Sequence, residues 1–338
     1  MLRSAANQED GKRSDGRAIG RSSAGCCGRP EAVSSLIVSW SLGVSCGGAW
    51  CRVGRSITRT FSTPRRLRDL RHRSASDYAV TTQRNGVRTI TLNDPSSRNS
   101  LSLEMLNVLL RDITKDQDAT ELRAIVVTGT PGQVFSAGHN LKQLTTAIGT
   151  DRHREIFSTC EKLMSAITAS PVPVIAAVDG LAAAAGCQLV AACDIAMCTE
   201  RSTFSTPGSN FGIFCSTPGV ALVRNVPRKV AAWMLFTGLP ISAHEAYEVG
   251  LVSKVVSPED LAKEISIITD AILAKSRSVV TIGKKFLHEQ IDLDLPTAYS
   301  LGTEIMVQSL KLKDSQEGLR SFIDKKKPVW THGYEKEQ

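Results

Sequence analysis

The sequence lacks the cysteine patterns of a metal site or of a disulfide framework. Nine cysteines are present, but the five in the later part of the chain form no C-x-x-C pair and no Cys/His spacing typical of zinc. An odd number of thiols favours free cysteines in a reducing compartment, most of them packed in the core. The cysteine spacing therefore predicts no metal site, and we also expect no resident cofactor. The five later cysteines are Cys160, Cys187, Cys193, Cys198 and Cys215.

Acidic residues are scarce in the front segment, which is rich in arginine and serine. Residues 1–75 hold 13 Arg, one Lys and five acidic residues, whereas residues 76–338 hold 27 basic and 28 acidic residues. The net charge of +8 therefore belongs to the front segment, whose composition is typical of a mitochondrial transit peptide. Arg59-Thr60-Phe61-Ser62 resembles a mitochondrial processing site. We expect a transit peptide over residues 1–61, a linker over 62–76 and a location in the mitochondrial matrix.

Two other interpretations of the front segment remain open. One is a disordered basic tail, or an N-terminal extension over about residues 1–50. The other is a short membrane or signal segment, because residues 33–50 carry no charge. Serine and glycine dilute the hydrophobicity of that stretch, which argues against a membrane span. The last residues, Lys336-Glu337-Gln338, differ from a peroxisomal S-K-L signal.

After the front segment, apolar runs and helical patterns alternate. Asn85-Gly86 lies between two strand-like runs and is the strongest short hairpin signal. Ser102 is placed to cap a helix with leucines at helical spacing, and "LRAIVVTG" is typical of a short buried strand. A helix over about residues 152–169, the strand "PVPVIAAVDG", a small-residue helix and the strand "DIAMCTE" follow. This order predicts an α/β domain of β-α-β units.

From Pro227 onward helical patterns dominate, apart from the short strand "LVSKVV". We expect a core domain over residues 77–257 and a C-terminal helical region over 258–338. The sequence shows no internal repeat after the front segment.

Two glycine- and alanine-rich stretches present backbone N–H groups. In "FSAGHNL" a glycine turn precedes the N–H of His139, and in "GLAAAAGC" the N–H groups of Ala184, Ala185 and Gly186 lie at the expected start of a helix. A helix N-terminus carries unpaired N–H donors and a positive dipole end. Two such donors directed at one carbonyl oxygen form an oxyanion hole, which stabilises an enolate or a tetrahedral intermediate. Close packing of small residues is the alternative interpretation of each stretch alone.

Taken together, the order and spacing of six motifs are similar to those of the enoyl-CoA hydratase/isomerase (crotonase) family. The resemblance spans about residues 78–330. The motifs are "NDPSSRNSLS", "FSAGHNLKQL", "PVPVIAAVDGLAAAAGCQLVAACDI", "FSTPGSNFGIFCSTPG", "TGLPISAHEAYEVGLVSKVV" and "EGLRSFIDKKKPVW".

The resemblance implies a crotonase (ClpP-like) spiral of repeated β-β-α units, with a C-terminal helical region that forms homotrimers or hexamers. It implies acyl-CoA as the ligand, with the N–H groups of His139 and Ala185 on the thioester carbonyl. His139, Asn140, Leu141 and Lys142 would line the bound acyl-CoA. The remaining implied CoA contacts are Arg98 and Ser100 near the adenine, and Phe322 and Lys325 from a neighbouring subunit.

The sequence departs from the family at the residues that perform hydration. Hydration needs an acid/base pair that places water across Cα and Cβ, and two glutamates do this in the family's hydratases. The resemblance places Gln188 and Gly208 at these positions. The isomerase branch commonly keeps the second glutamate, so its usual base is absent as well.

Other side chains near the expected pocket are His139, Cys187, Gln188, Ser209, Asn210, Cys215 and Ser216. His139 is able to titrate near neutral pH, although packing or hydrogen bonding is the more common role beside a turn. Gln188 is able to orient water or an acyl group without exchanging protons. Asp179 and Asp194 are the only carboxylates in this strand–helix–strand unit, and a loop or capping role is expected for Asp194.

These features predict a mitochondrial acyl-CoA-binding protein of fatty-acid metabolism, related to enoyl-CoA hydratases but without efficient hydratase activity. Three alternatives remain: a non-catalytic acyl-CoA sensor, a decarboxylase or thioesterase that uses only the oxyanion hole, and RNA binding. RNA binding is disfavoured because the helix after Ser102 carries Arg111 and Lys115 but also Glu104, Asp112 and Asp116, and so has no basic stripe.

Overall fold

A computed structural model describes residues 74–132 and 134–337 of the chain. The predicted transit peptide, the uncharged stretch over residues 33–50 and most of the predicted linker lie outside the described residues. In the part that is described, no helix has the length and apolar character needed to cross a bilayer.

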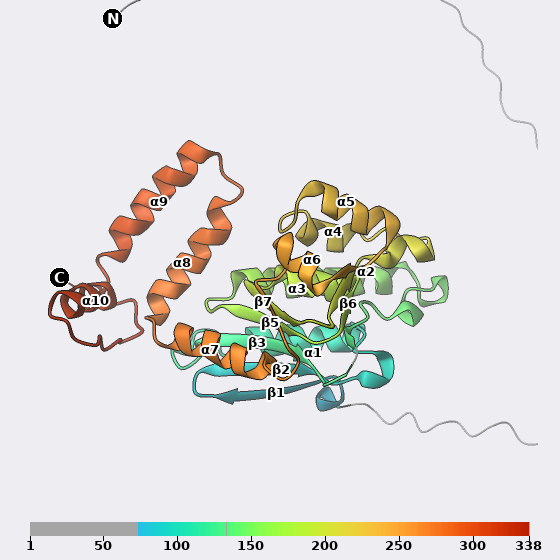
Figure 1. Ribbon diagram of the computed structural model, residues 1–338, viewed down its shortest axis with the longest axis horizontal. Coiled ribbons are helices and arrows are strands. Elements are labelled where there is room, and N and C mark those ends of the chain that lie inside the picture. The colour runs from blue at the N-terminus through green and yellow to red at the C-terminus, as the bar shows by residue number, and fades with distance from the viewer. Residues whose placement is uncertain (1–73, 133, 338) are drawn as a thin grey trace, which may run out of the picture. The chain divides into compact units, whose positions relative to one another are not determined.

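The predicted hairpin forms the first two strands in the described part of the chain (Figure 1). Strand β1 (Ala79–Arg84) pairs antiparallel with β2 (Val87–Leu92). The two turn residues between them, Asn85 and Gly86, both have positive φ values, 48° and 82°. Such a turn matches the right-handed twist of the strands, and Asn-Gly adopts it readily. The hairpin prediction is confirmed.

Six strands form the larger sheet, in the order β1-β2-β3-β5-β7-β10. From β2 onward all neighbouring strands are parallel. The apolar runs read from the sequence supply its centre, because strands covered on both faces need apolar residues throughout. The four further strands are β3 (Ala124–Gly129), β5 (Val174–Val178), β7 (Ile195–Thr199) and β10 (Lys254–Val256).

A smaller sheet has the order β4-β6-β8-β9. Its strands are β4 (Val134–Ser136), β6 (Leu181–Ala183), β8 (Thr203–Ser205) and β9 (Ile241–Ser242). Along the chain, a strand of the larger sheet, a strand of the smaller sheet and a helix follow one another three times. This alternation confirms the expected spiral of β-β-α units.

Three helices cover one face of the larger sheet and enclose the main apolar core. They are α1 (Leu103–Thr114), α2 (Thr150–Ala169) and α3 (Ala185–Ala192). The Ser102 side chain accepts a hydrogen bond from Met105 N at 3.2 Å, so the predicted cap of α1 is present. Most leucine and isoleucine residues of α1 are buried against α2 and the sheet.

Helices also dominate the later part of the chain, as predicted. Three short helices follow β8: α4 (Ser216–Leu222), α5 (Arg228–Thr237) and α6 (Ala243–Glu248). Four longer ones complete the chain: α7 (Leu261–Leu273), α8 (Arg277–Gln290), α9 (Leu295–Ser309) and α10 (Lys313–Ile323). Helix α7 packs on the second face of the larger sheet, where Ile265 and Ile268 cover Val126 and Ile175. Figure 1 shows α9 beside α8, away from the sheets.

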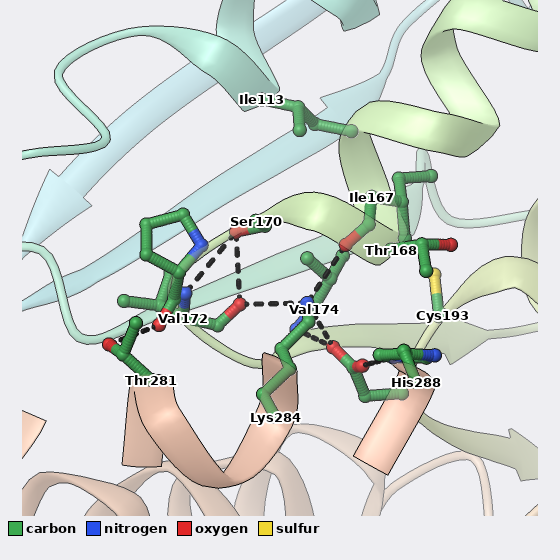
Figure 2. A network of polar contacts seen from close by, with 12 residues as sticks. Ile113, Ile167, Thr168, Ser170, Val172, Val174, Cys193, Thr281, Lys284 and His288 are labelled. Atoms are coloured by element: carbon green, nitrogen blue, oxygen red, sulfur yellow. Dashed lines mark hydrogen bonds and ion pairs between the residues drawn. The ribbon is translucent and has the colours of Figure 1, made fainter. Parts of the chain in front are cut away.

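A buried ionic network joins α8 to the core (Figure 2). Asp194, between α3 and β7, accepts a hydrogen bond from Val174 N at 2.7 Å. Its two carboxylate oxygens also contact Lys284 Nζ at 2.7 Å and His288 Nε2 at 2.9 Å. Lys284 Nζ donates further to Ile167 O at 2.8 Å and to Val172 O at 3.1 Å. Asp194 lies in the loop between α3 and β7, as expected, and its carboxylate links that loop to α8.

Candidate functional site

A cavity of about 530 Å³ lies where the loop after β4, the start of α3 and the segment before α4 meet. Its wall is mainly apolar. The lining residues are Arg98, Ala137, His139, Leu141, Leu144, Phe157, Leu181, Ala183, Ala184, Ala185, Pro207, Gly208, Phe211, Ile213, Phe214, Cys215, Ser216, Thr217 and Pro218. Apolar walls with a few placed polar groups are typical of small-molecule sites.

Gly138 allows the two predicted donor segments to meet at this cavity. Its φ is +82°, and a Cβ there would lie 2.7 Å from Ala183 O and 3.0 Å from Ala185 N. A side chain at Gly138 would therefore push the His139 loop away from the start of α3. Because His139 follows Gly138 directly, both donor residues line one cavity, as predicted.

Ala185 is the first residue of α3, so its N–H has no acceptor within the helix. Among the described residues, neither this N–H nor the backbone N–H of His139 donates a hydrogen bond. The sequence prediction was wrong for Ala184, whose N–H is taken by Ser205 O at 2.9 Å. Gly186 is not among the cavity-lining residues, since it faces Ser136 closely. Two donors, on His139 and Ala185, therefore remain for a ligand oxygen.

Ala184 has an unusual backbone conformation just before these donors, with φ 48° and ψ −117°. A non-glycine residue at positive φ is strained, typically by about 1–3 kcal/mol. The bond from its N–H to Ser205 O holds the strained turn against β8. Ala185, whose N–H is the first free one of α3, follows this turn directly and lines the cavity.

The His139 imidazole is packed inside the cavity wall. Its Nδ1 lies 3.2 Å from Leu101 O, and its ring meets the Phe157 ring edge to face at 5.1 Å between centroids. A carbonyl oxygen only accepts, so Nδ1 carries the proton and Nε2 presents a lone pair. Burial lowers the pKa of His139 and keeps the ring neutral at pH 7. Nε2 is buried and has no partner among the described residues.

Gln188 lies one turn further along α3 and is 6% exposed. It does not line the cavity, and its Oε1 has no partner among the described residues. A buried amide oxygen without a partner is uncommon in folded proteins.

Gly208 does line the cavity, but its surroundings leave no room for a side chain. A Cβ there would lie 2.3 Å from Ile213 O and 2.6 Å from Cys215 Sγ. Cys215 Sγ in turn accepts the Gly208 N–H at 3.2 Å. The segment from Gly208 to Cys215 therefore folds back on the glycine.

The five later cysteines are free, as predicted. Burial raises the pKa of Cys187 to about 12, and burial also raises the pKa of Cys215. Both side chains are therefore neutral thiols at pH 7 and weak nucleophiles. Cys187, Ser209 and Asn210 do not line the cavity, whereas Cys215 and Ser216 do.

The residues expected to contact CoA divide into three groups. Arg98 and Leu141 line the cavity. Ser100, Asn140 and Lys142 do not; the Ser100 hydroxyl is buried, and Asn140 Oδ1 accepts a hydrogen bond from Lys142 N at 3.1 Å. Phe322, on α10, and Lys325, just after it, are exposed and remote from the cavity lining. A contribution from Phe322 and Lys325 would therefore require a second copy of the chain.

The sequence did not indicate the aromatic part of the wall, because no pattern links these residues along the chain. Phe157 comes from α2, whereas Phe211 and Phe214 come from the segment before α4. The other carboxylate considered, Asp179, lies outside the lining and is bound by Thr199 Oγ1 at 2.8 Å and Arg201 Nε at 2.7 Å. Its hydrogen bonds with Arg201 lower the pKa of Asp179, so it is an ionised structural residue.

Comparison with known proteins finds similar chains in one family. The sequence model of the enoyl-CoA hydratase/isomerase family matches residues 82–333. The mitochondrial enoyl-CoA hydratase domain-containing protein 3 of Xenopus laevis is 54% identical over 261 residues, covering 77% of this chain and 88% of that protein. The Homo sapiens protein of the same name is 54% identical over 250 residues, covering 74% and 82%. The mitochondrial names of both agree with the predicted localisation.

Solved structures show the same fold. The crystal structure of human enoyl coenzyme A hydratase domain-containing protein 3 has a TM-score of 0.74 and 52% identity, covering 75% of this chain and all of that one (100%). An enoyl-CoA hydratase from Mycobacterium smegmatis has a TM-score of 0.73 and 40% identity, covering 75% and 98%.

Proposed function

Because this chain belongs to the enoyl-CoA hydratase/isomerase family, we propose that it binds acyl-CoA thioesters in the mitochondrion and does not catalyse efficient hydration. The observation that carries the proposal is one cavity with two backbone donors in its wall, lined by no aspartate or glutamate among the described residues.

The thioester carbonyl oxygen accepts hydrogen bonds from the N–H groups of His139 and Ala185. Preorganised N–H donors in an apolar cavity stabilise negative charge on an oxygen far better than water does. The closely packed Gly138 supports this assignment, since a side chain there would separate the two donor residues. The acyl group then lies along the apolar wall formed by residues such as Leu144 and Phe157.

Hydration is not expected, because water must be activated by a group that exchanges protons. Gln188 and Gly208 occupy the places of the family's two glutamates by resemblance. Glutamine has no titratable proton, and Gly208 is too enclosed to carry a side chain. His139 is a neutral acceptor in the wall, but its Nε2 is buried away from the cavity space.

The CoA portion is assigned by family resemblance. Arg98 is exposed at the cavity and is a suitable cation for the CoA phosphates. The loop that carries Arg98 also contains Ser100, and the loop that carries His139 continues through Asn140, Leu141 and Lys142. Phe322 and Lys325 act from a neighbouring subunit, so this assignment requires a homotrimer or hexamer.

A role in fatty-acid metabolism follows from the ligand class. The protein acts there as an acyl-CoA sensor, or as an enzyme whose main barrier is an oxyanion or enolate, such as a thioesterase or decarboxylase. The oxyanion hole supports both, and the absence of an ionisable carboxylate at the cavity favours the sensor.

The test is acyl-CoA binding by two matched glycine variants. Gly138→Ala and Gly149→Ala both place a side chain at positive φ, +82° and +89°, but only Gly138 has close neighbours. We expect Gly138→Ala to weaken octanoyl-CoA binding about tenfold or more, since it separates two hydrogen bonds to a polarised oxygen. Gly149→Ala should bind like the wild type in calorimetric titrations.

Equal affinities for both variants would contradict the proposed donors. Mass spectrometry of enoyl-, malonyl-type and saturated acyl-CoAs after incubation tests turnover separately. Binding without a product supports the sensor, whereas a free acid or a decarboxylated product identifies the enzyme.

A further inference from the structure

The cavity is open to solvent along an apolar edge. Phe211, Ile213 and Phe214 line the cavity, yet they are 62%, 46% and 51% exposed. Large apolar side chains with this exposure are unusual on one short segment. Because the same side chains touch both the cavity and solvent, a ligand that fills the cavity reaches the surface here.

The apolar surface continues beyond this edge onto α5. The Phe236 ring lies 6.0 Å from the Phe214 ring and is 70% exposed. Phe236 does not line the cavity itself. The end of α5 packs on this segment, because a Cβ at Gly238 would lie 2.9 Å from Asn210 Oδ1. Phe236 therefore lies beside the open edge.

The charges of the cavity indicate which acyl groups fit it. Arg98 is the only Lys, Arg, Asp or Glu among the lining residues that the structure describes, and the open edge of Phe211, Ile213 and Phe214 is entirely apolar. The three side chains of this edge offer a terminal carboxylate no charged or hydrogen-bonding partner. An unbranched hydrocarbon chain needs no such partner, and its affinity rises with every methylene covered.

We propose that the acyl group is a long hydrocarbon chain, whose distal end leaves the cavity between Phe211 and Phe214 and lies across Phe214 and Phe236. This assignment rests on the proposed acyl-CoA binding and names the chain class that the site prefers. Phe236 is then a residue that determines chain-length preference without touching the thioester.

The experiment compares octanoyl-CoA and palmitoyl-CoA below the micellar concentration, with wild-type protein, Phe236→Ser and the control Tyr247→Ser. Tyr247, on α6, is another exposed aromatic (54%) outside the cavity lining. For the wild type, palmitoyl-CoA should bind at least tenfold more tightly than octanoyl-CoA, since each buried methylene corresponds to about a fourfold gain.

Phe236→Ser should weaken palmitoyl-CoA binding about eightfold, the change that corresponds to uncovering roughly 50 Å² of ring surface. Octanoyl-CoA binding should not change, and Tyr247→Ser should leave both affinities unchanged. Sedimentation velocity of each variant checks the assembly state.

Three results would overturn the assignment: equal wild-type affinities for the two thioesters, no change of palmitoyl-CoA affinity in Phe236→Ser, or equal weakening of both ligands together with a changed assembly state. The last result would identify Phe236 as a subunit contact. Failure of the wild type to bind either thioester would instead refute acyl-CoA binding itself, so the two failures are distinguishable.

Discussion

Gly208 provides the sharpest structural prediction, because a single methyl group tests whether a side chain fits there. In Gly208→Ala the new Cβ would lie 2.3 Å from Ile213 O, 2.6 Å from Cys215 Sγ and 3.3 Å from Cys215 N. The first contact is with backbone, so rotation of a side chain does not relieve it. The segment before α4 must therefore move.

Two effects set the magnitude. Overpacking of a closed site typically costs about 1–3 kcal/mol. The Gly208 N–H bond to Cys215 Sγ, 3.2 Å long, would also be disturbed, at about 1 kcal/mol or less because sulfur is a weak acceptor. We expect the free energy of unfolding to fall by about 2–4 kcal/mol, measured by urea denaturation monitored by circular dichroism.

Gly283→Ala is the matched control. Gly283 lies inside α8, and a Cβ there meets nothing within 4 Å. Alanine should stabilise that helix by about 0.5–1 kcal/mol. Cys215→Ala combined with Gly208→Ala should recover only part of the loss, since the contact with Ile213 O remains. If Gly208→Ala unfolds at the same urea concentration as the wild type, the position is open, and the reasoning against a catalytic side chain there is refuted.

Three further predictions concern the surroundings of the site. Lys284→Met leaves the Asp194 carboxylate without its buried ammonium partner, so the free energy of unfolding should drop by about 3–5 kcal/mol in denaturant titrations; a change below about 1 kcal/mol would show that the network is not structural. Burial lowers the pKa of His139 in the folded protein, so the unfolded chain binds a proton more readily. The contribution of the neutral His139 ring to stability is therefore complete above pH 6.5, the ordinary pKa of histidine, and is lost as the pH falls through the pKa of the folded state. Thermal unfolding should therefore show a smaller loss for His139→Asn than for the wild type between about pH 7 and pH 5, and equal losses would contradict the buried neutral ring. Ala184→Gly should relieve the positive φ of 48° and raise the free energy of unfolding by about 1 kcal/mol or more in urea titrations, whereas a lowered value would mean that the conformation is not strained.

The elements with strong local signals could be predicted from the sequence. The Asn85-Gly86 hairpin and the Ser102 cap each depend on a few adjacent residues, so a short stretch of sequence is enough to predict them. The same holds for the buried strands, whose continuous apolar runs mark a sheet covered on both faces. The resemblance implied the second strand of each β-β-α unit, but the individual strands of the smaller sheet were not located, because strands of two or three residues are too short to show a period of two.

The candidate site was predictable where its geometry depends on the backbone. The sequence indicated the turn at Gly138 and the small residues at the start of α3, and both predicted donor residues line the cavity. Side-chain positions were less predictable. Gln188 was expected at the pocket, but it is buried and does not line the cavity. The aromatic part of the wall combines residues from α2 and from the segment before α4. Only the tertiary structure brings these together.

The buried network around Asp194 illustrates the same limit. The sequence suggested a loop role, but nothing in it pointed to Lys284 and His288, which lie 90 and 94 positions further along the chain. Ionic partners at such separations are set by how α8 docks on the core (Figure 2). Sequence patterns report helix faces and caps, but not which buried charges on two elements will meet.

The most direct test of the central claim incubates the mature protein with crotonyl-CoA in water enriched in heavy oxygen and follows the products by mass spectrometry. Octanoyl-CoA binding is measured by calorimetry on the same preparation. We expect saturable octanoyl-CoA binding, with crotonyl-CoA recovered without heavy oxygen at carbon 3. Formation of labelled 3-hydroxybutyryl-CoA at ordinary enzyme rates, about 1–1000 per second, would contradict this expectation.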